Sequence, residues 1–190
     1  EFDHKDILYF RIDRRRKLPV TVLLRAIGLD NEEILDTFYS HDEFSFSKGK
    51  VTLKLFPQRL RGEIAKFDIK DKKNKIIVEK DKRITVRHIR EIENAGISSI
   101  VVPSDYLIGR VLAKKIIDVE TGEIISDCNA TIDEALLEKL TSFDEYTIHT
   151  LFVNDLDNGP YISDTMKLDD SIDELSARVV IYRMMRPGEP

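Results

Sequence analysis

Two apolar patterns near the start of the chain predict a strand and a helix. Residues Ile7–Ile12 read ILYFRI, a short run of β-branched and aromatic residues that is typical of a strand. Pro19 and Gly28 then enclose the segment PVTVLLRAIG. Proline suits the first turn of a helix and glycine the position after its last turn, so the spacing predicts a helix over this segment.

A second helix and a change of pattern follow. Asp30 and Glu33 stand at the spacing of a capping box, and we expect three apolar residues of DNEEILDTFYS on one side of the helix. These are Ile34, Leu35 and Phe38. From about residue 40 the pattern favours short strands such as Val51–Phe56, preceded by turn residues at positions 48–50.

The apolar positions repeat at an offset of about 48 residues, which aligns residues 61–102 with 109–150. The aligned apolar pairs are Ile69 with Ile117, Ile76 and Ile77 with Ile124 and Ile125, Ile84 with Ile132, Ile89 with Leu137, Ile92 with Leu140, and Ile100 with Ile148. Each copy predicts a strand, a turn, a strand, a capped helix and a strand. We expect the pairs 69/117, 77/125 and 100/148 to be buried in matching positions.

The helix ends of the two copies also have recognisable signals. Thr85 is the expected cap of the first helix and Gly96 its end, whereas Thr131 and Glu134 predict a capping box for the second. Beyond the copies, YISDTMKL and SARVVIYRMM read as a pair of strands. The chain is therefore expected to be α+β, with mixed small sheets and short helices, and both ends suggest a piece of a longer chain.

Composition narrows the class of protein. The chain of 190 residues is 42% hydrophobic and 34% charged, enough for a packed core, and has no apolar run of membrane-spanning length. The single cysteine, Cys128, favours a reducing compartment and hence the cytoplasm. The net charge of −5 hides an asymmetry of +7 over residues 1–117 and −14 over residues 118–174. Such a chain could face a polyanion with one part and repel it with another.

A search for catalytic or metal-binding patterns finds none. The four histidines, His4, His41, His88 and His149, lie far apart and lack metal-site spacing, so we expect no metal. Cys128 has no histidine or lysine beside it and is expected to be a small core or edge residue. The adjacent carboxylates Asp169 and Asp170 are expected in solvent. Nucleophile-elbow, P-loop and dinucleotide motifs are absent.

The segment RIDRRRKLP concentrates positive charge. It places five cations in seven positions, namely Arg11, Arg14, Arg15, Arg16 and Lys17. Their mutual repulsion calls for compensation, either by a phosphate backbone or by an acidic protein surface. A solvated face paired with Asp3, Asp6 and Asp13 explains the same pattern. The lysines at 70–75 and 80–83 fit the ordinary protection of hairpin edges.

Five strings along the chain are distinctive when taken together, namely YFRIDRRRKLPVTVLLRAIG, FPQRLRGEIAKFDI, VEKDKRITVRHIREIE, TLFVNDLDNGPYIS and IYRMMRPGEP. In this order they resemble the beta subunit of bacterial DNA-directed RNA polymerase. The resemblance implies that residues 1–38 and 153–190 belong to the lobe, a wall of the DNA cleft beside downstream DNA and the non-template strand. Residues 39–152 would form a lineage-specific inserted module, containing the two copies.

The resemblance also implies which residues face DNA. Asp13, Arg14 and Arg15 of RIDRRRKLP, with Arg183 and Arg186 of YRMMRPGEP, are the positions carried over by motif. Arginines would bind phosphates without reading sequence, and Asp13 would accept from a base edge or hold an arginine fork. If so, Arg14, Arg15 and Arg186 should converge on one side, with the two lobe segments paired in one sheet.

Further expectations concern partners and chemistry. The complete polymerase is a nucleotidyltransferase whose Mg is bound by the beta-prime subunit, so this chain alone would carry no catalytic residue and no cofactor. Implied partners are DNA, the beta-prime, alpha and omega subunits, sigma factor, and secondary-channel regulators of the DksA type docking on the insertion. No membrane partner is expected, the location would be cytoplasmic at the nucleoid, and the chain alone would be monomeric. The alternative is a free-standing protein-interaction module that binds no nucleic acid.

Overall fold

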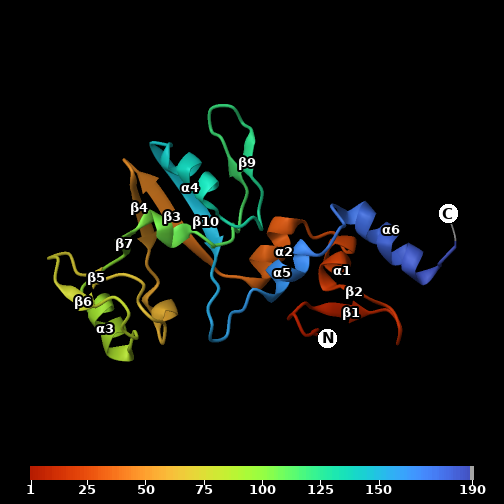
Figure 1. The fold of residues 1–190 in the computed structure, drawn as a ribbon, viewed down its shortest axis with the longest axis horizontal. Helices are drawn as coiled ribbons and strands as arrows, with labels where there is room; N and C mark the ends of the chain where they lie inside the picture. Colours follow the sequence, from red (N-terminus) through yellow and green to blue (C-terminus); the bar gives the residue numbers. More distant parts are fainter. Residues whose placement is uncertain (189–190) are drawn as a thin grey trace. The chain divides into compact units, whose positions relative to one another are not determined.

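A computed structural model of the chain describes residues 1–188, which form short helices and small antiparallel sheets (Figure 1). The predicted α+β class is confirmed. The chain packs as two compact units. Unit 1 combines residues 1–41, 111–130 and the described residues after 150, and unit 2 combines residues 42–110 and 131–150.

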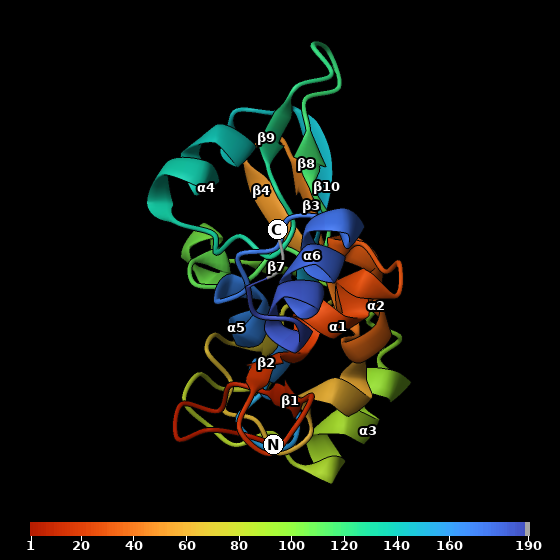
Figure 2. The same cartoon turned by 90° about the vertical axis from the view of Figure 1, so that its right-hand side faces the viewer.

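Unit 1 contains two hairpins and four helices. Its elements are β1 (Tyr9–Arg11), β2 (Lys17–Pro19), α1 (Val20–Ala26), α2 (Asn31–Phe38), β8 (Ile116–Ile117), β9 (Ile124–Ser126), α5 (Tyr161–Lys167) and α6 (Glu174–Met185). The pairs β1–β2 and β8–β9 are antiparallel. Figures 1 and 2 show α6 beside α1, and Leu18, Val22 and Ala177 are buried where these elements pack.

The sequence signals of the first two helices are confirmed. Pro19 is the N-cap of α1, and Gly28 follows the helix with a φ of 103°, a conformation that glycine adopts at little cost. Asp30 caps α2 in a full capping box with Glu33. Ile34 and Leu35 are fully buried, but Phe38 at the end of α2 is 49% exposed, so it does not share their environment.

The predicted strand pair after residue 160 is wrong, because both segments are helices, α5 and α6. Four residues of α6 pack toward α1 at helical spacing: Ala177, Val180, Ile181 and Met184. Asp173 begins the helix by accepting from the backbone N–H of Ser176. Residues 1–38 and 153–188 therefore meet through helix packing. The expectation that the two segments pair in one sheet is wrong.

Unit 2 is built on a four-stranded antiparallel sheet in the order β10-β3-β4-β7. Its strands are β3 (His41–Ser47), β4 (Lys50–Lys54), β7 (Ser99–Val102) and β10 (Glu145–Leu151). The first residue of β3 and the last residue of β10 are assigned to unit 1. The other elements are the 3-10 helices η1 (Pro57–Leu60) and η2 (Ser104–Leu107), the hairpin strands β5 (Ile69–Lys70) and β6 (Ile76–Val78), and the helices α3 (Val86–Asn94) and α4 (Glu134–Thr141). Phe44 of β3 is fully buried in this unit.

The two aligned segments have the same order of elements. The first runs β5, β6, α3 and β7, and the second runs β8, β9, α4 and β10. A 3-10 helix precedes each series and is followed by a glycine with positive φ, 83° at Gly62 and 84° at Gly109. The elements begin 47 residues apart up to the first hairpin strand and 48 residues apart at the second hairpin strand and at the helix. The hairpin loop of the second copy is therefore one residue longer.

This shift decides which predicted pairs are buried. Ile69 is 3% exposed, but Ile117 is 37% exposed and Ile116 takes the equivalent buried position at 1%. The expectation for Ile117 is wrong because the uniform offset of 48 ignored the longer loop. Ile77 and Ile125 match each other but are only half-buried, so the expectation that this pair is buried is wrong. Ile100 and Ile148 are both buried as expected. That the copies arose by duplication stays a prediction.

The predicted helix cap is confirmed in the first copy and wrong in the second. Thr85 caps α3, and Gly96 follows its end with a φ of 61°. In α4 the cap is Asp133, whose side chain accepts from the backbone N–H of Leu136 at 2.8 Å. The predicted box of Thr131 and Glu134 is wrong, because Asp133 stands closer to the first turn and Glu134 is the first helical residue.

Packing divides the chain differently from the predicted boundaries 38/39 and 152/153. The segment Val111–Ala130 belongs to unit 1, where Ala113 and Cys128 lie in one core with Ile34 and Leu35. Residues 39–152 therefore do not all share a core of their own. Whether that segment is an insertion in the lobe stays a prediction.

Candidate nucleic-acid interface

The β1–β2 loop carries three of the five predicted site residues and is ordered by its own aspartate. The Asp13 carboxylate accepts from the backbone N–H groups of Arg15 and Arg16, each at 2.8 Å. These two hydrogen bonds hold the pKa of Asp13 below its usual range. Asp13 also lies 3.3 Å from Arg16 Nε. In this structure Asp13 thus shapes the loop that presents the arginines.

The arginines of the basic segment differ in what they contact. Arg11 forms a bidentate pair with Glu1, at 2.9 and 2.6 Å, and also donates to the Arg14 carbonyl. Arg16 is half-buried. The side chains of Arg14 and Arg15 are exposed and form no ion pair with residues 1–188. Arg14 and Arg15 are therefore available to an external anion.

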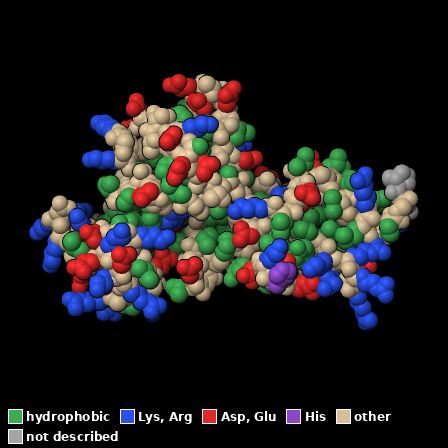
Figure 3. Space-filling view, viewed as in Figure 1, with side chains coloured by type: hydrophobic (Ala, Val, Ile, Leu, Met, Phe, Trp, Pro, Cys, Tyr) green, Lys and Arg blue, Asp and Glu red, His purple; other side chains and the backbone are tan. Residues whose placement is uncertain are grey.

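The other two predicted residues lie at the C-terminal end of α6. Arg183 is in its last turn and Arg186 is its C-cap, with the guanidinium 6.0 Å from the Tyr182 ring centroid. Arg16 Nη1 donates to the Met184 carbonyl, which connects the β1–β2 loop to this helix end. Lys and Arg side chains gather over both elements in Figure 3. The structure therefore brings the two motifs to one end of unit 1.

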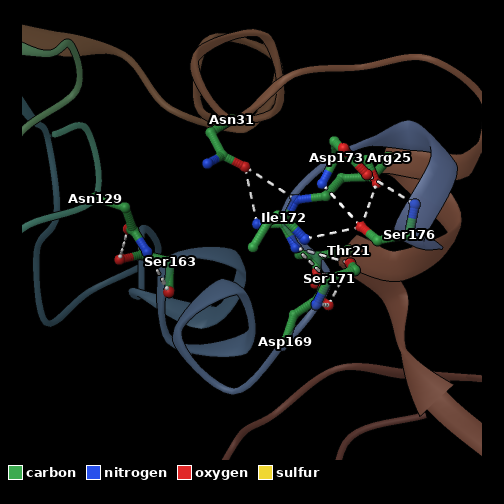
Figure 4. Close-up of polar contacts among 10 residues, drawn as sticks. All are labelled: Thr21, Arg25, Asn31, Asn129, Ser163, Asp169, Ser171, Ile172, Asp173 and Ser176. Atoms are coloured by element: carbon green, nitrogen blue, oxygen red, sulfur yellow. Dashed lines mark hydrogen bonds and ion pairs between the residues drawn. The ribbon is translucent and has the colours of Figure 1, made fainter. Parts of the chain in front are cut away.

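A buried polar network fixes the beginning of α6 relative to α1 (Figure 4). Arg25 Nη1 lies 2.5 Å from the Asp169 carboxylate and 3.1 Å from Ser171 Oγ. The Thr21 hydroxyl donates to the same carboxylate at 2.6 Å, and Arg25 also donates to Asn31 Oδ1. The charged pair is nearly excluded from solvent, with side-chain exposures of 5% and 1%. It sets the position from which α6 extends toward the β1–β2 loop.

Sequence reasoning missed this network. Asp169 was expected in solvent beside Asp170, but only Asp170 is exposed. Arg25 gave the one available signal, since it stands one turn after Thr21 on the face of α1 that also carries Val22. An arginine on a buried helix face requires an acidic partner, although its identity was not readable from spacing.

Other candidate chemistry gives no further site. Burial, followed by the nearby Asp127 carboxylate, raises the pKa of the Cys128 thiol to about 12, so the buried thiol is a core residue as predicted. Among residues 1–188, no group of three or more His, Cys, Asp or Glu side chains is placed to hold a metal ion. Within the same residues no helix has the length and apolar character needed to span a bilayer.

The geometry defines a class of site. Two exposed arginines on an ordered loop, beside a helix end with two more, can contact phosphates through charge-assisted hydrogen bonds, and such phosphate contacts carry no sequence information. The arrangement can therefore bind phosphate groups.

A known protein family matches the first part of the chain. Residues 1–63, about a third of the chain, match the family RNA polymerase Rpb2, domain 2. The match supports the second-largest subunit of a DNA-directed RNA polymerase, a nucleotidyltransferase complex that acts in transcription with DNA and other polymerase subunits as partners. It includes Asp13, Arg14 and Arg15 and does not extend to Arg183 or Arg186.

Proposed function

We propose that the chain is part of the lobe of a bacterial RNA polymerase beta subunit and acts as a wall of the DNA cleft. Residues 1–38 and 153–190 would form the lobe, with Asp13, Arg14, Arg15, Arg183 and Arg186 toward DNA. The observation that carries the proposal is that Ile12 and Met184 pack in one apolar cluster, with Arg16 donating to the Met184 carbonyl, so that the two arginine-bearing elements lie together. The family match over residues 1–63 supports the same assignment.

Residues 39–152 would be a lineage-specific insertion that docks transcription regulators. Its residues 118–152 hold one Lys against nine Asp or Glu, and this balance of −8 favours a protein partner there because it repels a phosphate backbone. The candidate partners are sigma factor and secondary-channel regulators of the DksA type, alongside the beta-prime, alpha and omega subunits. In this proposal the catalytic Mg belongs to another subunit, and the assembly lies at the nucleoid in the cytoplasm.

The test removes charge from the proposed interface in the assembled polymerase. We expect Arg14→Ala, Arg15→Ala and Arg186→Ala together to weaken the open complex with DNA and to reduce its salt dependence. Each lost phosphate contact should lower the slope of log K against log salt by about one unit. The measurement is open-complex stability over a series of salt concentrations.

A matched control removes three charges elsewhere. Lys73→Ala, Lys75→Ala and Lys80→Ala take the same charge from the β5–β6 hairpin region and should leave the slope unchanged. An unchanged slope in the arginine variant would instead assign these residues to the fold or to a protein interface. That result would favour the alternative, a protein-interaction module without nucleic-acid binding.

A further inference from the structure

The sheet of unit 2 ends in an open strand, β7, which pairs only with β4 among the described strands. The Leu55 N–H donates to the Ser98 carbonyl, and the register places Leu53 opposite Ile100 and Val51 opposite Val102. In an antiparallel pair, hydrogen-bonded positions alternate along the strand. Ile100 and Val102 therefore bond to β4, while the N–H and C=O groups of Ser99 and Val101 face outward.

A groove runs beside this open edge within unit 2. It has a volume of about 810 Å³ and is lined by residues 97–103 on one side and by residues between Phe67 and Asn74 on the other. The Phe67 ring is held edge-on against Tyr106, with centroids 5.0 Å apart. Val101 is 64% exposed although it is apolar. The groove thus offers unpaired backbone groups together with apolar side chains.

The wall opposite β7 belongs to a basic segment. Residues 66–83 contain eight Lys or Arg against four Asp or Glu, and Figure 3 shows basic side chains gathered around the β5–β6 hairpin and α3. Lys70 and Lys72 line the groove, and neither forms an ion pair with a described residue. The Asp68 and Asp71 carboxylates in the same wall already accept backbone N–H groups. These carboxylates keep their charge, so the groove lining itself is balanced, and it is the excess of four positive charges over residues 66–83 as a whole that favours an acidic ligand.

We propose that the edge of β7 binds an extended acidic peptide segment of a protein partner as a fifth strand of the sheet. The outward groups of Ser99 and Val101 would supply main-chain hydrogen bonds, and Lys70 and Lys72 would attract the carboxylates. A nucleic acid lacks the alternating donors and acceptors of a strand, so a peptide fits this edge better. The inference rests on the proposed docking role of residues 39–152 and names the site and chemistry of the partner.

The first experiment titrates the chain of residues 1–190 with a synthetic peptide of about seven alternating glutamate and valine residues, a typical strand length. Binding is followed by calorimetry and by backbone amide shifts. We expect the Ser99 and Val101 amides to shift most. Val101→Pro removes one outward donor but no bond to β4, and should weaken binding about tenfold. The matched control Val101→Thr keeps the donor and should bind normally.

The second experiment tests the charge. Lys70→Glu with Lys72→Glu should weaken the acidic peptide severalfold and flatten its salt dependence. Lys80→Glu with Lys82→Glu makes the same charge change at lysines that do not line the groove, and should have a smaller effect. A peptide with lysine in place of glutamate should not bind.

Three results would overturn the inference. The first is that the acidic peptide does not bind, and the second is that Val101→Pro binds it as tightly as the unchanged chain while its other amide shifts stay the same. The third is that a thymidine oligonucleotide, and not the peptide, shifts the Ser99 and Val101 amides. The salt slope of the polymerase open complex is independent of these measurements. If regulators still require residues 39–152 while the peptide fails to bind, only the β7 site is removed and the proposed docking role stands.

Discussion

Two neighbouring carboxylates, Asp169 and Asp170, differ in what surrounds them. Asp169 is paired with Arg25 in the interior, and it also accepts from the hydroxyls of Thr21 and Ser171. Asp170 lies in solvent. Removing one member of a buried ion pair leaves the other charged and desolvated, which costs more than losing the attraction between them.

Asp169→Ala should therefore lower the free energy of unfolding of unit 1 by about 3–5 kcal/mol. Asp170→Ala is the matched control and should change it by less than about 0.5 kcal/mol. Urea titration followed by amide signals of α1 measures both variants within the unit concerned. Equal effects would mean that the Arg25–Asp169 pair contributes no more than a surface contact.

Asp13 should make the order of the β1–β2 loop depend on pH. Its pKa in the folded chain is below the unfolded value of about 3.9, because the carboxylate accepts from the Arg15 and Arg16 N–H groups. The stabilisation is therefore present above the unfolded pKa and is lost as the pH falls through the folded one. We expect these two amide signals to shift with a midpoint below 3.9. The shift should vanish in Asp13→Asn, and a midpoint at or above 3.9 would contradict the assigned hydrogen bonds.

At the scale of elements, α6 explains why a helix was predicted as a strand. Its inner face carries Ala177 and Val180, while its outer face also has large apolar residues, including Leu175 and Val179. A segment that is apolar on both faces has no clear helical period, and β-branched residues then favour a strand reading. The cap at Asp173 was the local signal that could have corrected it.

The cap of α4 gives a prediction at the same scale. Asp133→Ala removes the acceptor of the Leu136 N–H and should reduce the stability of this helix by about 1 kcal/mol. Asp133→Asn retains a good capping side chain and should cost much less. Hydrogen exchange of the first-turn amides of α4 distinguishes the two. Equal protection in both variants would show that the carboxylate does not cap the helix.

At the scale of the whole chain, packing crosses the boundaries that composition and repeats indicate. The segment Val111–Ala130 lies inside the second copy, yet Ala113 and Cys128 are buried with Leu35 and Leu151 of unit 1. The copies are thus equivalent in their order of elements and different in what their hairpins pack against. The distribution of charge, in contrast to the packing, agrees with the boundaries of the copies, since the basic segment 66–83 lies in the first copy and the second copy is acidic.

Features that depend on neighbouring residues could be predicted from the sequence. The caps at Asp30 and Thr85, the ends at Gly28 and Gly96 and the order of elements in the copies all follow from short-range hydrogen bonding and apolar spacing. The basic loop at 13–15 was readable in the same way, because its charges are adjacent in the chain.

Features that depend on residues far apart in the chain became visible only in the folded structure. The Arg25–Asp169 pair joins positions separated by 144 residues, and Arg16 meets Met184 across 168. The helical state of α6 depends on packing against α1, and the open edge of β7 depends on which strands complete the sheet. The spacing of residues along a sequence does not show which distant groups meet, because the burial of side chains and the pairing of strands and charges depend on the packing of the folded chain.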